Sequence, residues 1–149
     1  MSIMIRDTLI EDIKREEGYR ASVYLDSLQK PTIGYGFLID SLELQEDICQ
    51  LILMRKLEKL IKTIKFNFKW FDDMPEKIQD VIINMCYQLG VSGVSKFKKT
   101  IQFMKNRQWD KASVEMLDSK WGREQTPQRA LRLSKTVKSV EEDTNGFSD

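Results

Sequence analysis

The sequence predicts an α+β fold, mainly α, in which a small antiparallel β-sheet lobe and an all-helical C-terminal lobe are joined by a long helix. Residues 19–39 are rich in β-branched and aromatic side chains, and a turn-like break at 26–31 divides them, as in a small sheet. Apolar residues then recur with mostly helical spacing to about residue 66, which predicts the connecting helix. The apolar segments that follow also have helical spacing, so the second lobe is predicted to be all-helical.

The chain is expected to form one domain, 1–149, because its length suits a single domain made of two lobes. The first lobe is expected at about 14–65 and the second at about 66–149, with the first helix packing near the cleft. A cleft between two lobes is a common place for a ligand.

The first lobe is predicted to begin with a helix over residues 3–17, which carries the apolar stripe Leu9, Ile10 and Ile13. Gly18 is placed to end this helix, because glycine readily takes the backbone conformation that follows a last helical turn. Strands are then predicted at 19–25 and 32–39, forming a hairpin or a small sheet.

Local signals predict where the later helices begin and end. Two capping boxes, each an Asp followed three residues later by a Glu, predict the starts of the long helix and of the helix after it. Gly90 is placed to end the second of these, whose core at 81–87 is apolar nearly all round and should be the buried centre of the second lobe. The capping boxes are Asp40 with Glu43, and Asp73 with Glu76. Further helices are predicted near 95–106, near 109–120 and, from the Thr126-Pro127 pair, to about 138.

The composition favours a soluble protein with a packed core, since 41% of residues are hydrophobic and 32% are charged. The apolar runs are too short to span a bilayer, so no stable membrane insertion is expected. Residues 1–13 lack the unbroken apolar stretch of a signal peptide. The protein is therefore expected to be made in the cytoplasm without a secretion signal of its own.

Histidine is absent, which excludes a Ser-His-Asp triad, a Cys-His pair and His-ligated zinc. No metal or cofactor is expected, and carboxylates, Lys, Tyr, Ser or Cys must carry any proton chemistry. The two cysteines, Cys49 and Cys86, lie in apolar helical patterns and are expected to be reduced, buried thiols.

Charge is unevenly distributed along the chain. Residues 1–74 carry 11 basic and 13 acidic side chains, whereas residues 75–138 carry 13 basic and 6 acidic ones. The second half can therefore attract a polyanion such as nucleic acid or an anionic cell wall. Residues 141–149 are acidic and polar, and this end is expected to fray.

Glu17 is a candidate general acid. It continues the apolar stripe one helical turn after Ile13, which draws its carboxyl group towards the interior. The negative end of the helix dipole and the neighbouring Glu16 also favour the protonated form. A carboxylic acid kept protonated near neutral pH can donate a proton in catalysis. Taken alone, however, a solvated glutamate in a fraying last turn is the better explanation.

Asp26 and Thr32 also have ordinary explanations when each is taken alone. Asp26 ends a predicted strand, where aspartates usually satisfy turn backbone groups, and Thr32 fits a strand. Together with Glu17 they supply an acid, a second carboxylate and a hydroxyl that can converge on one cleft wall. Two carboxylates across a glycosidic bond are the usual equipment for sugar hydrolysis, and they need no histidine.

These residues lie in segments that resemble the active-site region of the phage-type lysozymes, the endolysins or muramidases, and most closely their T-even phage members. The resemblance rests on Glu17 to Arg20, Tyr24, Asp26 and the run Thr32 to Gly36. It continues through Ile83 to Gly90, Gly93 to Phe97, Arg107 to Ala112, Trp121 and Gln125 to Ala130. It covers most of the chain and implies a lysozyme-like two-lobe fold.

The resemblance also implies an activity. It is hydrolysis of the β-1,4 bond between N-acetylmuramic acid and N-acetylglucosamine of peptidoglycan, with inversion, for bacterial cell lysis. In this family Glu protonates the leaving oxygen, while Asp and Thr hold or activate the attacking water. These roles fall on Glu17, Asp26 and Thr32, and inversion predicts carboxyl groups ~6.5–9.5 Å apart.

Substrate contacts are also implied by the resemblance. The family's sugar-contacting positions fall on Leu38, Tyr87, Thr100 and Glu115, and Gln88 is a plausible further contact. Tyr87 has a flat face for a sugar ring but could equally be a core aromatic. Glu115 replaces the family's Asn and Thr100 its Ser, which puts substrate preference in doubt.

Three more features concern stability. Phe37 stands where the family commonly has histidine, and the usual acidic partner has no clear match, which suggests an apolar contact in place of an ion pair. The segment between Ile39 and Leu44 is short for the T-even type, so a small helix is expected to be missing. Arg129 is expected to pair with an acid near the first helix.

Three other functions are consistent with parts of the sequence. A lytic transglycosylase cuts the same bond without water and needs one catalytic acid, so Asp26 and Thr32 argue against it. A non-catalytic wall-binding protein would not need Glu17, Asp26 and Thr32, so the presence of all three argues against it. A nucleic-acid-binding helical domain is disfavoured because the basic residues are scattered over several helices. The protein is expected to be a monomer that binds peptidoglycan and no nucleic acid, and that is released to the wall through a holin pore.

Overall fold

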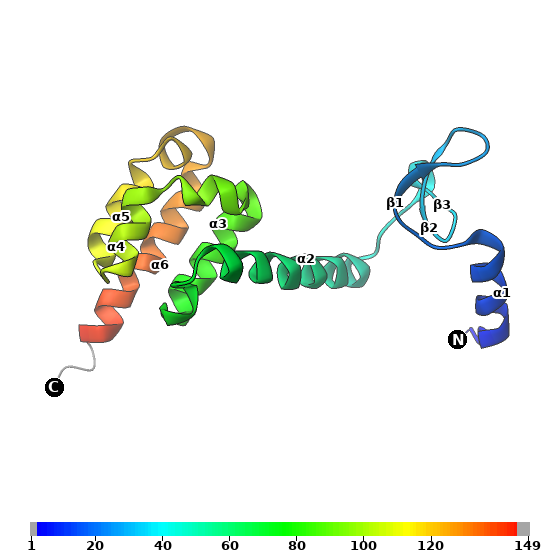
Figure 1. Ribbon diagram of the computed structural model, residues 1–149, viewed down its shortest axis with the longest axis horizontal. Coiled ribbons are helices and arrows are strands. Elements are labelled where there is room, and N and C mark those ends of the chain that lie inside the picture. Colours follow the sequence, from blue (N-terminus) through cyan, green and yellow to red (C-terminus); the bar gives the residue numbers. More distant parts are fainter. Residues whose placement is uncertain (1–2, 146–149) are drawn as a thin grey trace. The chain divides into compact units, whose positions relative to one another are not determined.

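A computed structural model describes residues 3–145, apart from the side chains of residues 142, 144 and 145. It is mainly helical and contains a three-stranded antiparallel sheet, so the predicted α+β fold class is confirmed (Figure 1). The chain divides into two compact units, Met1–Cys49 and Gln50–Asp149.

The first unit begins with helix α1 (Asp7–Glu17), which starts four residues later than predicted. Gly18 ends the helix as predicted: its φ of +70° lies in the left-handed region, and its N–H donates to Lys14 O at 2.8 Å. The apolar stripe does not form a core, since Leu9, Ile10 and Ile13 are 39–49% exposed.

The sheet consists of β1 (Arg20–Leu25), β2 (Pro31–Gly34) and β3 (Phe37–Leu38), in that order. The predicted strand 32–39 is two strands, because the chain turns between Gly34 and Phe37 at a glycine with φ +74°. The register places Thr32 of the central strand opposite Tyr24 on one side and Leu38 on the other.

Both predicted capping boxes are wrong, and for the same reason. Asp40 lies in a 3₁₀ turn, η1 (Ile39–Ser41), and helix α2 (Glu46–Asn67) begins five residues after that turn ends. Asp73 likewise ends a 3₁₀ turn, η2 (Phe71–Asp73), and the residue that precedes α3 is Pro75. An aspartate inside a tight turn cannot also be the N-cap of a later helix.

The second unit is helical throughout its described part. Its central helix, α3 (Glu76–Ser95), bends at Gly90, where φ is +77°, so helical geometry stops where the sequence predicted. The predicted short helices are α4 (Lys98–Lys105) and α5 (Trp109–Leu117), and a short π-helix, η3 (Trp121–Gln125), follows. The last helix, α6 (Pro127–Asn145), starts at the predicted proline and continues beyond its predicted end at residue 138. The predicted fraying of 141–149 is wrong for 141–145, because α6 continues through them, and the rest of that segment lies outside the described residues.

The hydrophobic core lies in the second unit and is centred on α3, as predicted. This helix buries Ile78, Val81, Ile82, Met85, Cys86 and Val94. Around it α4, α5, η3 and α6 contribute Met104, Trp109, Ala112, Met116, Trp121, Ala130, Val137 and Val140. Figure 1 shows α4, α5 and α6 beside α3. Because these apolar side chains are buried between the helices, their removal from water stabilises this unit.

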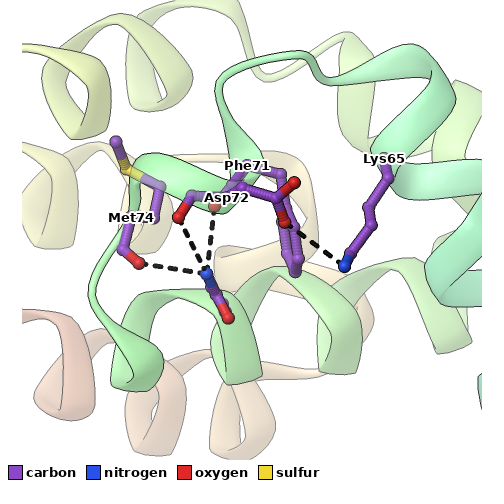
Figure 2. A network of polar contacts seen from close by, with 5 residues as sticks. Lys65, Phe71, Asp72 and Met74 are labelled. Atoms are coloured by element: carbon purple, nitrogen blue, oxygen red, sulfur yellow. Dashed lines mark hydrogen bonds and ion pairs between the residues drawn. The ribbon is translucent and has the colours of Figure 1, made fainter.

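A polar network fixes the turn between α2 and α3 (Figure 2). The side-chain amide nitrogen of Gln79 lies 3.3, 3.4 and 3.1 Å from the carbonyl oxygens of Phe71, Asp72 and Met74. The Asp72 carboxylate also pairs with Lys65 at 3.4 Å. One amide thus contacts three carbonyl groups of this turn, of which Phe71 O also accepts the Met74 N–H.

The two cysteines differ in environment. Cys86 is buried in the core, and this burial raises the pKa of its thiol to about 12. Cys49 is exposed near the start of α2, so the prediction that both thiols are buried holds for Cys86 alone. Between residues 3 and 145, no helix is both long enough and apolar enough to cross a bilayer.

Candidate active site

The β1–β2 hairpin positions Asp26 through backbone hydrogen bonds. Its Oδ1 accepts the N–H groups of Leu28 and Lys30, both at 2.9 Å, and its own N–H donates to Lys30 O at 3.0 Å. Gln29, within the turn, takes a left-handed φ of +62°. The ordinary role of a turn aspartate is therefore present, and it also holds the carboxylate in one orientation. Oδ2 has no hydrogen bond to any described residue and can accept another donor.

Thr32 is joined to Asp26 through the backbone of Lys30. The Thr32 side chain is only 2% exposed, and its Oγ1 donates to Lys30 O at 2.9 Å. The same carbonyl oxygen accepts the Asp26 N–H. Because the hydroxyl proton is used in that bond, the lone pairs of Oγ1 are left to accept a hydrogen bond from a bound molecule.

Leu38 lies beside Thr32 in the sheet. The two residues are direct cross-strand partners, and Tyr24 is the partner of Thr32 on the other strand. Residues directly opposite each other share one face of a sheet. Leu38 is 37% exposed, so the predicted contact position is accessible on the face that carries Thr32.

Glu17 is the last residue of α1, and its carboxyl group lies against Gly36 in the β2–β3 turn. A methyl group on Gly36 would collide with Glu17 Oε2, so with any other residue here the carboxyl group would have to move. The expected interior position is wrong for the described structure, because Glu17 is exposed. The stripe that it continues is itself half-exposed, so following the stripe does not bury the residue.

Aromatic contacts join the end of α1 to the same turn. The rings of Tyr19 and Tyr35 are 5.6 Å apart, and Lys14 Nζ lies 5.6 Å from the Tyr35 ring centre. Phe37 packs edge-on against Tyr35 at 6.3 Å, and its ring covers the Cα of Gly34. Phe37 therefore makes apolar contacts within its own turn, and the expected replacement of an ion pair to the long helix stays a prediction.

The remaining predicted contact residues belong to the second unit and do not form one group. Tyr87 is 49% exposed, so it is not a core aromatic residue. It lines a hollow of about 410 Å³ together with Asn84 and Arg129. Thr100 and Glu115 line a different hollow, of about 340 Å³.

Gln88 and Arg129 have structural partners. Gln88 Oε1 accepts the indole N–H of Trp121 at 3.0 Å, and its amide nitrogen donates to Thr126 Oγ1 at 3.2 Å. Arg129 donates from Nε to Asn84 Oδ1 at 2.8 Å and from a terminal nitrogen to the Asn84 carbonyl at 3.1 Å. These bonds use two of the five N–H donors of the guanidinium, and the predicted pairing of Arg129 with an acid near the first helix stays a prediction.

One residue of the site, Lys30, was not singled out from the sequence. Gly36 was visible as the second glycine of a Gly-x-Gly pattern, which can mark close approach of another group. Lys30 gave no signal, because it acts through its backbone N–H and carbonyl, and any residue type has these groups.

Comparison with known proteins identifies the family of this chain. The family model "Phage lysozyme" matches residues 14–136. The chain belongs to the phage lysozyme family. The resemblance inferred from the residues is thus confirmed, and membership supports peptidoglycan hydrolysis, a glycoside hydrolase activity, at the level of the family.

Individual relatives of this phage lysozyme chain are distant. It is 25% and 27% identical to two proteins of Dictyostelium discoideum described as "Probable T4-type lysozyme 2" and "Probable T4-type lysozyme 1". Each match covers 85% of this chain and 91% of the relative. A third match, 28% identical, is to the "Pre-baseplate central spike protein Gp5" of Enterobacteria phage T4 and covers 87% of this chain but 27% of that protein.

Proposed function

We propose that this protein cleaves the β-1,4 bond from N-acetylmuramic acid to N-acetylglucosamine in peptidoglycan, with inversion, and thereby lyses bacteria. The observation that carries the proposal is the hairpin around Lys30, whose backbone fixes Asp26 and Thr32 together. Glu17, held beside Gly36 in the same compact unit, supplies the acid.

In the proposed reaction Glu17 donates a proton to the glycosidic oxygen as its bond to the anomeric carbon breaks. A water molecule held by Asp26 Oδ2 and Thr32 Oγ1 attacks the opposite face of that carbon, and Asp26 accepts the water's proton. One attack from the opposite face inverts the configuration, and the water requires carboxyl groups ~6.5–9.5 Å apart.

The partner of this activity is the bacterial wall, and the site needs no cofactor. We further propose that the protein is a monomer made in the cytoplasm of the infected cell and released to the wall through a holin pore. Leu38, Tyr87, Gln88, Thr100 and Glu115 are proposed to contact substrate, with Gln88 constrained by its bonds to Trp121 and Thr126.

The decisive test compares Glu17→Gln with Glu16→Gln in a turbidity assay on purified cell walls. Both changes remove one exposed carboxylate from the last turn of α1, so the second controls for the loss of charge. Glu17→Gln is expected to fold normally, as judged by circular dichroism, and to lose about 10³-fold or more of the lytic rate, because no acid remains to protonate the leaving group. Comparable lysis by both variants would refute the assignment.

Asp26→Asn tests the second carboxylate separately. The amide oxygen can still accept the two backbone N–H groups, so the hairpin is retained while the base is lost. The mass of the released sugar then separates hydrolysis from transglycosylation, since the hydrolytic product is heavier by one water. An anhydro product, or an active Asp26→Asn variant, would favour the lytic transglycosylase. Binding to walls without any cleavage by the wild type would favour a non-catalytic wall-binding protein.

A further inference from the structure

Helix α1 carries the proposed acid, Glu17, but contributes no buried residue to the first unit. Its ion pairs lie within the helix itself. Within residues 3–145 no hydrogen bond joins α1 to the strands or to the turns between them. The joint at Gly18 adds no packing, since a methyl group there would meet nothing within 4 Å. Other contacts must therefore hold Glu17 at the β2–β3 turn.

Tyr35 is the residue of this turn that meets the end of α1. The centre of its ring lies 5.6 Å from that of Tyr19 and 5.6 Å from Lys14 Nζ. Both distances are in the range of attractive aromatic and cation–π contacts. Lys14 precedes Glu17 and Tyr19 follows it, so Tyr35 is contacted from both sides of the acid along the chain. Because Gly36 is the next residue, these contacts lie beside the place that the Glu17 carboxyl group occupies.

The Tyr35 ring is also fixed by its own turn. Gly34 and Gly36 flank it with φ values of +70° and +74°, a conformation that other residues adopt only at a cost. Phe37 packs edge-on against Tyr35 with ring centres 6.3 Å apart, and its ring covers the Cα of Gly34. A ring that is fixed to the sheet in this way can in turn fix the helix end that it contacts.

The hydroxyl groups of Tyr19 and Tyr35 take no part in these contacts. Neither donates or accepts a hydrogen bond with any residue that the structure describes. The contact between the two residues consequently depends on their rings, which phenylalanine also has. A tyrosine that transferred a proton in the reaction would instead need its hydroxyl group.

We propose that Tyr35, contacted by Tyr19 and Lys14, is a positioning residue that keeps the Glu17 carboxyl group at the β2–β3 turn. This inference rests on the proposed function, because it concerns the acid of that reaction. Tyr35 directly follows β2, the strand that carries Thr32, so the ring contacts join the acid to the strand whose hydroxyl group is proposed to hold the water. A displacement of about 1 Å can cost about 10²-fold in rate, so a small movement of α1 is enough to slow the reaction.

The first test measures the position of the acid by NMR in the full chain. The amide shift of Gly36 is expected to follow the titration of the Glu17 carboxyl group, and Glu17→Gln should abolish this change. Tyr35→Leu is expected to lose most of the change, whereas Tyr35→Phe should keep it because the ring remains. The measurement needs no substrate, so it tests the positioning whether or not the protein cleaves walls. An unchanged Gly36 titration in Tyr35→Leu would overturn the proposal.

Cleavage of soluble peptidoglycan chains then measures the consequence for catalysis. Tyr35→Leu is expected to lower kcat about tenfold or more and to change KM by less than about threefold, because a displaced acid weakens an interaction made in the transition state. Tyr35→Phe should keep the wild-type kcat, as should Phe66→Leu, which removes a 74% exposed ring from α2. A wild-type kcat in Tyr35→Leu, or an equal loss in either control, would overturn the positioning role. Absence of cleavage by the wild type would instead refute the proposed function.

Tyr19→Leu provides a second variant in case Tyr35→Leu does not fold. Tyr19 is 66% exposed, so its replacement should have little effect on stability, which circular dichroism can verify. It removes the ring that Tyr35 contacts and is expected to lower kcat and to weaken the Gly36 titration, as Tyr35→Leu does. Wild-type values of both quantities in folded Tyr19→Leu would overturn the proposal.

Discussion

The two compact units are held together by different interactions. All 18 buried hydrophobic side chains of the described residues lie in the second unit, around α3. In the described part of the first unit the one buried residue is Thr32, and large apolar side chains such as Leu28 and Val23 are 72% and 58% exposed. The first unit is ordered instead by hairpin hydrogen bonds, ring contacts and glycines with positive φ.

The buried core and the proposed catalytic residues therefore belong to different units. The proposed catalytic residues belong to the unit with little core, and backbone groups orient them. The second unit buries enough apolar surface to hold its helices in place and to shape hollows on its surface. Substitutions in the two units should therefore have separable effects on folding and on catalysis.

The largest expected effect on folding comes from the core of the second unit. Ile82→Ala removes a side chain that is 1% exposed and should lower the free energy of unfolding by about 2–5 kcal/mol, through lost burial and the cavity left behind. Leu28→Ala, in the exposed hairpin of the first unit, should change it by no more than about 0.5 kcal/mol. Urea unfolding followed by circular dichroism measures both, and similar losses would erase the contrast between the units.

A matched pair of glycines separates backbone strain from disturbance of the acid. Gly18 has a φ of +70° and Gly36 a φ of +74°, so alanine at either position should cost about 1–3 kcal/mol of stability. A methyl group at Gly18 meets nothing within 4 Å, whereas one at Gly36 collides with the Glu17 carboxyl group. Gly36→Ala alone should therefore also reduce wall lysis, by about 10²-fold if the acid moves by 1 Å.

Temperature must be chosen so that both glycine variants remain folded during the lysis assay. If Gly18→Ala loses lytic activity as strongly as Gly36→Ala at equal folded fraction, the specific role of the Gly36 contact is refuted.

The last expected effect, which appears only at alkaline pH, concerns the buried thiol. Burial raises the pKa of Cys86 from 9.0 to about 12, so above pH 9 the unfolded chain loses this proton while the folded protein retains it. Stability from this group is thus complete below pH 9 and falls as pH rises from 9 to 12, by up to about 1.4 kcal/mol per pH unit. Wild type and Cys86→Ala should differ in the slope of unfolding free energy between pH 8 and 10.5, measured by urea titration with reductant. Cys49→Ala, which removes an exposed thiol, should keep the wild-type slope, and an unchanged slope in Cys86→Ala would contradict the burial effect.

Several helix ends in both units could be predicted from the sequence because their signals are local. The helix ends at Gly18 and Gly90 and the start at Pro127 depend on backbone preferences of single residues, and all three were correct. The all-round apolar pattern at 81–87 also identified the buried helix, although Tyr87 at its end is half-exposed. The capping boxes failed because Asp–Glu spacing does not reveal a competing 3₁₀ turn.

The candidate site was predictable in identity but not in arrangement. Glu17, Asp26 and Thr32 lie within sixteen consecutive residues, so their types and spacing could be read directly. Their connection through the Lys30 peptide could not, because every residue offers the same N–H and carbonyl. The exposure of Cys49 and the pairing of Arg129 with Asn84 likewise depend on which surfaces meet.

By itself, the sequence determined the fold class, the family and the three residues proposed to carry the reaction, since these depend on periodicity, residue type and order along the chain. Only the tertiary structure decided which backbone groups hold those residues, which apolar side chains are buried, and which residues line each surface hollow. The physical reason is that hydrogen bonds and burial depend on distances between atoms from separate segments, and those distances exist only once the chain has folded.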